Sequence, residues 1–220
     1  LILLLTVFAE DVFRVPMALY RYFTMGDMAK GNYFPERRAF ISKIALGLAA
    51  IPLASVLYGI YKGRYNYKVL KYTLEFDDLP KAFDGYKITQ ISDIHSGSFD
   101  DKDKVNYAVN LINEQKSDVI LFTGDMVNNK AEEMHDYMEV FGQLQAKDGL
   151  FSILGNHDYG DYVSWESDAA KHENLENLKR IQKQIGFDLL LNENRYLEKD
   201  GERIALIGVE NWGTGGFKKA

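Results

Sequence analysis

The distribution of apolar and charged positions divides the chain at about residue 67. From Ile44 to Ile60, 17 consecutive residues carry no charge, which is the lower limit for a helix that crosses a membrane. Pro52 lies inside this run, and spanning helices tolerate proline better than soluble helices do. A buried core helix of a soluble protein is the alternative, but the apolar start of the chain and the basic residues on both sides of the run favour the membrane. We therefore predict a membrane-anchoring region over residues 1–67, with a span over about 44–60 and a candidate partial span over 1–9.

Basic residues flank the predicted span almost evenly, so their count alone does not orient it. Arg37 and Arg38 begin a segment, residues 37–43, that resembles the twin-arginine export signal, in which paired arginines precede an apolar helix. Ordinary anchoring charges on the cytoplasmic side are the alternative interpretation. Both interpretations leave the two arginines in the cytoplasm. They predict a protein of the bacterial inner membrane whose downstream domain lies on the periplasmic or extracytoplasmic side.

After residue 67 the pattern changes to alternating strands and helices. Apolar residues with a period of two, or in short runs, predict strands, and apolar residues spaced by three and four predict helices. The strands are expected over residues 69–76, 86–91, 119–122, 150–154, 189–191 and 204–209, and the helices over 103–115, 131–144 and 174–185. This alternation predicts an α/β domain with stacked layers over residues 68–220.

Composition narrows the class of protein. A net charge of −6 argues against a nucleic-acid partner, whose footprint would be a basic patch. An anionic substrate still fits an acidic protein when bound metal ions supply the local positive charge. The absence of cysteine excludes thiolate metal ligands. Because the chain begins without methionine and ends soon after a strand-like run, we expect it to be a fragment.

Three short polar motifs follow three of the predicted strands. They are Ser92-Asp93-Ile94-His95, Thr123-Gly124-Asp125 and Leu154-Gly155-Asn156-His157-Asp158. His95 and Asp125 are 30 residues apart, and Asp125 and Asn156 are 31 apart, each about the length of one strand–helix–strand unit. The motifs are therefore expected to meet at the edge formed by the carboxyl ends of the strands, where α/β folds place their sites.

The residue types in these motifs suit divalent metal ions. Asp93 and His95 are two residues apart, so in an extended segment both side chains point the same way. A carboxylate and an imidazole together suit Mn, Fe, Zn or Ni. Asp125 follows a glycine that permits close approach, and its two oxygens can bridge two cations. Asn156 offers a neutral carbonyl oxygen.

The last motif also supplies candidate catalytic groups. His157 would project near the metals without needing to bind one, free to act as a general acid. Asp158 would accept a hydrogen bond from its ring and raise the pKa of the imidazole. Each motif alone is a weak signal, but all three in this order leave an accidental match only about one chance in twenty.

This order of motifs resembles the calcineurin-like metallophosphoesterase superfamily over residues 68–209. The resemblance implies a layered β-sandwich flanked by helices, here preceded by the membrane region. It makes Asp93 and His95 ligands of one metal ion, Asp125 the bridge, and Asn156 a ligand of the second. It makes His157 the acid and Asp158 the residue that orients it.

The chain departs from the superfamily pattern in one respect. A later histidine and a Gly-His-x-His motif do not occur in these residues, and the remaining His135 and His172 are expected to lie on exposed helix faces. We expect the missing ligands beyond Ala220; the alternative is a degenerate relative.

The function implied is that of a membrane-anchored phosphoesterase. The membrane lead-in and the Tyr159-Gly160 pair resemble the bacterial membrane-anchored branch, which is similar to lipid-precursor and phosphodiester hydrolases. Two divalent metal ions would activate water to hydrolyse a phosphodiester or pyrophosphate, with a lipid-linked substrate as one candidate. A catalytically degenerate interaction module at the membrane is the alternative.

Overall fold

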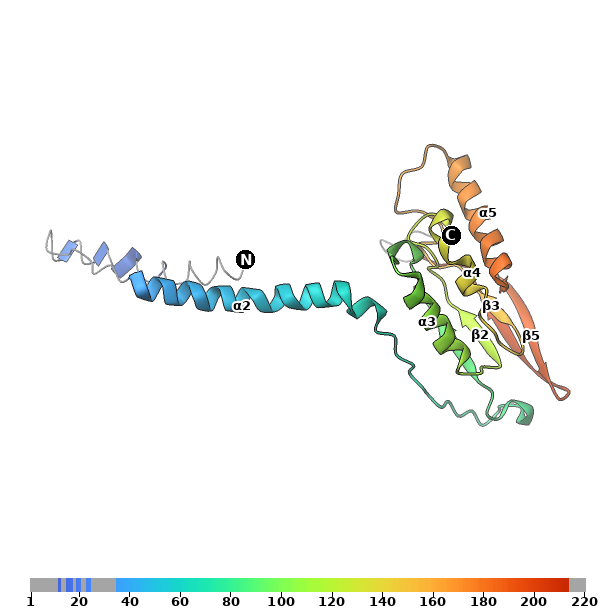
Figure 1. Ribbon diagram of the computed structural model, residues 1–220. Coiled ribbons are helices and arrows are strands. Elements are labelled where there is room, and N and C mark those ends of the chain that lie inside the picture. Colours follow the sequence, from blue (N-terminus) through green and yellow to red (C-terminus); the bar gives the residue numbers. More distant parts are fainter. Residues whose placement is uncertain (1–11, 13–14, 18, 21–22, 25–34, 214–220) are drawn as a thin grey trace. The chain divides into compact units, whose positions relative to one another are not determined.

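The computed structural model describes residues 12, 15–17, 19–20, 23–24 and 35–213 (Figure 1). The chain forms two compact units, Leu1–Tyr67 and Lys68–Ala220. The predicted partial span over residues 1–9 lies outside the described residues.

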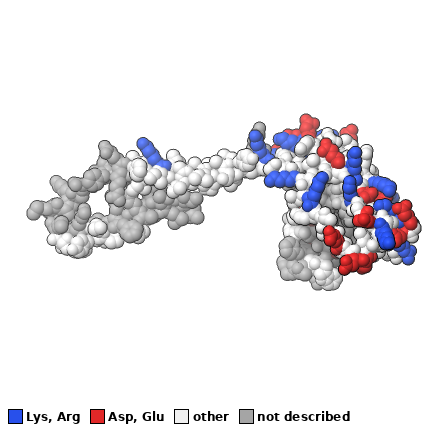
Figure 2. All heavy atoms as spheres, turned by 90° about the horizontal axis from the view of Figure 1, so that it is seen from below, with Lys and Arg blue, Asp and Glu red and all other residues white. Residues whose placement is uncertain are grey.

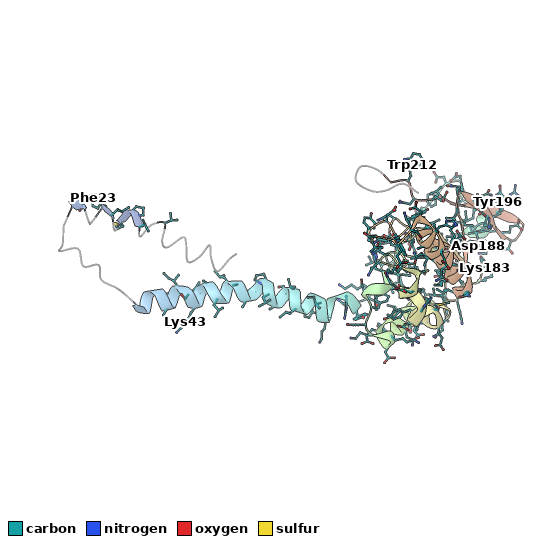
Figure 3. All side chains as sticks on the ribbon, turned by 90° about the horizontal axis from the view of Figure 1, so that it is seen from above. Phe23, Lys43, Lys183, Asp188, Tyr196 and Trp212 are labelled. Atoms are coloured by element: carbon teal, nitrogen blue, oxygen red, sulfur yellow. The ribbon has the colours of Figure 1, made fainter. Side chains whose placement is uncertain are left out.

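The first unit contains one long helix, α2 (Pro35–Tyr61), which includes the predicted span. Within the described part of the chain it is the one helix long and apolar enough to cross a membrane. Most of its apolar side chains are exposed, as Figure 3 shows for the helix beyond Lys43, whereas Ala45 is buried and Ile41 and Ala49 on the same face are partly buried. An exposed apolar surface of this extent is typical of a helix surrounded by lipid or by other helices.

The second unit is built on a four-stranded parallel sheet. Its strands are β1 (Ile88–Ile91), β2 (Val119–Phe122), β3 (Leu150–Ser152) and β4 (Phe187–Leu189), paired in that order. Ile91 pairs with Phe122, and Phe122 pairs with Ser152. The three strands that precede the polar motifs therefore end level with one another at one edge of the sheet.

Helices connect these parallel strands. They are α3 (Lys102–Asn113), the 3-10 helix η5 (Ala131–Tyr137), the short α4 (Met138–Phe141) and α5 (Asp168–Ile185). The helix expected over residues 131–144 is thus mostly a 3-10 helix. The helix expected from residue 174 begins six residues earlier, because Ser167 caps it by accepting a hydrogen bond from the Ala170 N–H. Shorter 3-10 turns lie at η2 (Gly63–Tyr65), η3 (Lys81–Phe83) and η4 (Ser96–Ser98).

An antiparallel hairpin forms a second layer against the sheet. Strands β5 (Glu193–Lys199) and β6 (Glu202–Gly208) are joined at Asp200-Gly201, both with positive φ. Leu197 of the hairpin shares an apolar cluster with Phe83 and Val119. Ile120 and Phe122, which alternate with Val119 along β2, are also buried, so both faces of the sheet are covered. The expected α/β class with stacked layers is confirmed.

The strand expected over residues 69–76 is wrong. This segment has no regular secondary structure, and its large apolar side chains are exposed. Alternation of apolar residues predicts a strand only where a neighbouring strand supplies hydrogen bonds. No strand among residues 35–213 pairs with this segment.

Candidate metal centre

The three polar motifs meet in space as the spacing predicts. The loop after β1 lies against the loop after β2 through three backbone hydrogen bonds of 3.0 Å: Asp93 N–H to Gly124 O, His95 N–H to Asp125 O, and Ser96 N–H to Met126 O. The loop after β3 joins them, because the His157 N–H donates to Asp125 Oδ1 at 2.9 Å. The carboxylate of Asp125 therefore lies at the centre of the three motifs.

Two glycines make this approach possible. A Cβ atom on Gly124 would overlap the backbone of Gly155, and a Cβ on Gly155 would overlap the carboxylate of Asp125. Gly124 also has φ of +100°, which L-residues with side chains seldom adopt. Glycine is required at both motif positions because the loops touch there.

Nitrogen and oxygen donors gather around Asp125. One donor atom each from His95, Asp125 and His157 lies within 4.8 Å of the others. His95 Nε2 is 3.8 Å from Asp125 Oδ2 and 3.8 Å from Asp93 Oδ1. Asp93 is 66% exposed while Asp125 is 11% exposed, so the cluster runs from the surface into a nearly buried position. Mixed imidazole and carboxylate donors at these separations can hold a first-row divalent metal ion.

Three of the candidate ligands have an unusual backbone conformation. Asp93, His95 and Asp125 have φ of 54°, 47° and 62°. A left-handed conformation at a residue other than glycine costs roughly 1–3 kcal/mol and persists where the surrounding contacts enforce it. Here the hydrogen bonds between the loops enforce it, which aims the three side chains toward one another.

The imidazole of His157 is fixed by three neighbours. Its Nδ1 lies 2.8 Å from the carbonyl oxygen of Asn128, its ring stacks on Tyr162 at a centroid distance of 4.6 Å, and the His95 ring meets it edge-on at 4.7 Å. Because a carbonyl oxygen only accepts hydrogen bonds, Nδ1 carries a proton. Nε2 is therefore the nitrogen available for chemistry.

Asp158 does not accept the hydrogen bond from the His157 ring that the sequence predicted. Its carboxylate is fully buried and accepts hydrogen bonds from four backbone N–H groups, those of Asp125, Met126, Val127 and Gly155. These donors occupy the carboxylate, so the ring of His157 bonds to Asn128 instead. Burial raises the pKa of Asp158 to about 7; the backbone donors oppose this rise, and the negative charge of Asp125 adds to it. Asp158 ties the second and third motifs together.

Two contacts were not foreseen from sequence, those of Asn128 and Tyr162. Asn128 lies three residues after Asp125, and its carbonyl oxygen acts through the backbone, which residue type does not reveal. Tyr162 accepts a hydrogen bond from Asn156 Nδ2 at 2.8 Å and stacks on His157. The only signal for Tyr162 is its place in the loop directly after the third motif. His135 and His172 are exposed, as expected.

Comparison with known families identifies the fold that carries this site. A family model described as "Calcineurin-like phosphoesterase" matches residues 86–219, more than half of the chain. The chain belongs to this family. Calcineurin-like phosphoesterases use divalent metal ions, and the cluster of His95, Asp125 and His157 is a candidate site for one. A second model, "Probable Calcineurin-like phosphoesterase, transmembrane domain", matches residues 1–64.

Several curated calcineurin-like phosphoesterases are similar to this chain. The uncharacterized metallophosphoesterase YkuE of Bacillus subtilis is 32% identical over 132 residues, covering 58% of this chain and 46% of that protein. A transmembrane protein with metallophosphoesterase domain from Danio rerio is 28% identical over 157 residues, 67% of this chain and 36% of that protein. The UDP-2,3-diacylglucosamine pyrophosphatase LpxG of Chlamydia muridarum is 33% identical over 123 residues, 54% of this chain and 37% of that protein. The chain thus spans less than half the length of these relatives.

Proposed function

We propose that this chain belongs to a membrane-anchored, metal-dependent phosphoesterase that hydrolyses a phosphodiester or pyrophosphate with two divalent metal ions. The observation that carries the proposal is the convergence of His95, Asp125 and His157 within 4.8 Å, with Asp93 beside them, at the carboxyl edge of the sheet. This donor set fits Mn, Fe, Zn or Ni.

Each residue of the centre has a defined role in this proposal. Asp93 and His95 would hold one ion, Asp125 would bridge, and Asn156 would hold the second. When bound, such ions supply Lewis-acid activation of water and neutralise charge on phosphoryl oxygens. The carboxylate of Asp125 suits the bridge because the His157 N–H fixes Oδ1 while Oδ2 faces His95.

His157 is the proposed general acid. Its Nδ1–H is held by the carbonyl oxygen of Asn128, which fixes the plane of the ring. The proton at Nε2 of the imidazolium passes to the oxygen that leaves as the P–O bond breaks. Asp158 supports this step indirectly, because it anchors the loop that carries His157 to the loop that carries Asp125.

The proposed substrate lies near a membrane surface. The match of residues 1–64 to a transmembrane domain model and the apolar helix α2 support anchoring of the enzyme in a bilayer. Among the relatives, LpxG is a pyrophosphatase whose name gives a diacylated substrate. A lipid-linked pyrophosphate is therefore the substrate class we favour, on the extracytoplasmic side of a bacterial inner membrane.

Hydrolysis of bis-p-nitrophenyl phosphate by the intact protein in detergent, with and without Mn²⁺, tests the proposal. We expect Mn²⁺-dependent hydrolysis that Asp125→Asn abolishes together with metal binding. Asp136→Asn makes the same change at an exposed carboxylate of η5 and should leave hydrolysis and metal binding unchanged. A wild-type protein that binds no divalent metal would favour a degenerate interaction module instead.

The membrane side is tested separately with a reporter enzyme fused after Lys62. Activity of a reporter that folds only outside the cytoplasm is expected. A fusion that is active only when the reporter remains in the cytoplasm would overturn the assigned orientation.

A further inference from the structure

Tyr162 touches two of the side chains to which the proposed function assigns roles. Its hydroxyl oxygen accepts a hydrogen bond from Nδ2 of Asn156 at 2.8 Å. Its ring stacks on the imidazole of His157, with ring centroids 4.6 Å apart and 26° between the planes. The residue lies in the loop that follows the third motif and belongs to none of the three motifs.

The hydrogen bond to Tyr162 uses the nitrogen of the Asn156 side-chain amide and not its oxygen. A side-chain amide has two N–H donors on one branch and a carbonyl acceptor on the other. When the Nδ2 branch is held by Tyr162, the carbonyl oxygen Oδ1 points along the other branch. A cation needs the oxygen and is repelled by the N–H groups. The hydroxyl of Tyr162 therefore holds the side chain of Asn156 in an orientation that leaves its carbonyl oxygen unoccupied by this bond, as metal binding requires.

The ring of Tyr162 restricts the tilt of the His157 imidazole. The carbonyl oxygen of Asn128 fixes the imidazole within its own plane, whereas Tyr162 covers one of its faces. Offset stacking of aromatic rings favours one tilt over others. The two contacts together hold the ring of His157, which lies edge-on to the His95 ring at a centroid distance of 4.7 Å.

We propose that Tyr162 is a positioning residue of the metal centre, whose hydroxyl orients Asn156 as a metal ligand and whose ring holds His157. This inference rests on the proposed roles of Asn156 and His157. The two contacts use different parts of the tyrosine, so two substitutions separate them. Tyr162→Phe removes the hydroxyl and keeps the ring, and Tyr162→Leu removes both.

The test measures Mn²⁺ dissociation constants by calorimetry on the intact protein in detergent, together with kcat and KM for bis-p-nitrophenyl phosphate. Tyr162→Phe is expected to weaken one of the two Mn²⁺ sites about 10-fold, within the range for residues that orient a metal ligand, with unchanged Tm. Tyr162→Leu is expected to weaken that site equally and to lower kcat further. Tyr107→Phe makes the same change at an exposed tyrosine of α3 and should change nothing.

A double-mutant cycle shows whether the hydroxyl acts through Asn156. In an Asn156→Ala background, Tyr162→Phe is expected to cause no further loss of Mn²⁺ affinity. Wild-type affinity in Tyr162→Phe, or an equal loss with and without Asn156, would overturn the inference while leaving the proposed function in place. A wild-type protein that binds none of Mn²⁺, Fe²⁺, Zn²⁺ and Ni²⁺ would overturn the proposed function, and this inference with it.

Discussion

Helix α2 and strand β2 each carry an uncharged apolar run but present it to different surroundings. On α2, Ile51, Leu53 and Leu57 are each more than half exposed. On β2, Val119, Ile120 and Phe122 are at most 1% exposed, because two strands flank β2 and apolar layers cover both of its faces. Apolar sequence alone does not separate a core from a membrane surface; the number of packed neighbours does.

The charges follow the same division. Figure 2 shows the surface of α2 uncharged over most of its length, whereas the unit Lys68–Ala220 displays basic and acidic side chains side by side. Burying apolar surface contributes roughly 25 cal/mol per Å², so an exposed run of this length strongly favours a nonaqueous environment. We infer that α2 serves anchoring and the second unit serves catalysis. If so, substitutions in α2 should affect membrane anchoring and leave catalysis unchanged, and substitutions in the second unit should do the reverse.

The largest expected effect belongs to the catalytic unit. His157→Asn should lower kcat about 10²–10⁴-fold, the range for removal of a general acid, while metal content and membrane attachment stay at wild-type values. Steady-state kinetics beside elemental analysis of the purified protein checks this. Loss of bound metal in this variant would instead make His157 a ligand, since its side chain lies within the donor cluster.

The next prediction concerns the anchoring unit. Leu53→Arg places a charge in the middle of α2, which costs about 2.5–3.5 kcal/mol for insertion at the centre of a membrane. Export of the reporter fused after Lys62 should fall, while hydrolysis per bound metal ion is unchanged. Leu53→Val serves as the control. Unchanged export would mean that α2 does not cross the bilayer.

The same substitution, glycine to alanine, made once in each unit tests whether only the second unit affects hydrolysis. Gly155→Ala forces a methyl group onto the carboxylate of Asp125, and a displacement of about 1 Å in such a site costs about 100-fold in rate. Gly59→Ala in α2 meets no atom within 4 Å and should leave hydrolysis unchanged. Rates of both variants within twofold of wild type would show that the loops do not need the close approach described here.

The meeting of the three motifs at the candidate metal centre was predictable because each motif follows a strand. Once β1, β2 and β3 are parallel and end level, Asp93, Asp125 and Asn156 must lie at the same edge. The hydrogen bonds within the centre were less predictable. Asp158 binds backbone N–H groups and Tyr162 binds Asn156, and both choices depend on loop conformation rather than on residue type.

The strand predictions that differ from the structure also depend on contacts that a single segment of sequence does not reveal. Residues 69–76 alternate like a strand yet find no partner among the described strands, whereas β5 has only a weakly apolar sequence yet pairs along its whole length with β6. The Asp200-Gly201 turn was the local signal for that hairpin, because both residues adopt the positive φ that a tight hairpin needs. A strand forms where a partner strand supplies its hydrogen bonds, and the apolar pattern of the segment itself reports that partner only in part.

The start of α5 gives the smallest expected effect and separates stability from catalysis within one unit. Apolar spacing places this helix too late because its first six residues include no large apolar side chain. The hydroxyl of Ser167 sets the true start by accepting a hydrogen bond from the Ala170 N–H at 3.1 Å. Ser167→Ala should cost about 1 kcal/mol and lower Tm by about 2–4 °C, with kcat unchanged. Ser167→Asp, which keeps a capping oxygen, should restore Tm. A fall in kcat without a fall in Tm would instead mean that the start of α5 influences the candidate metal centre, through the loop that carries Tyr162.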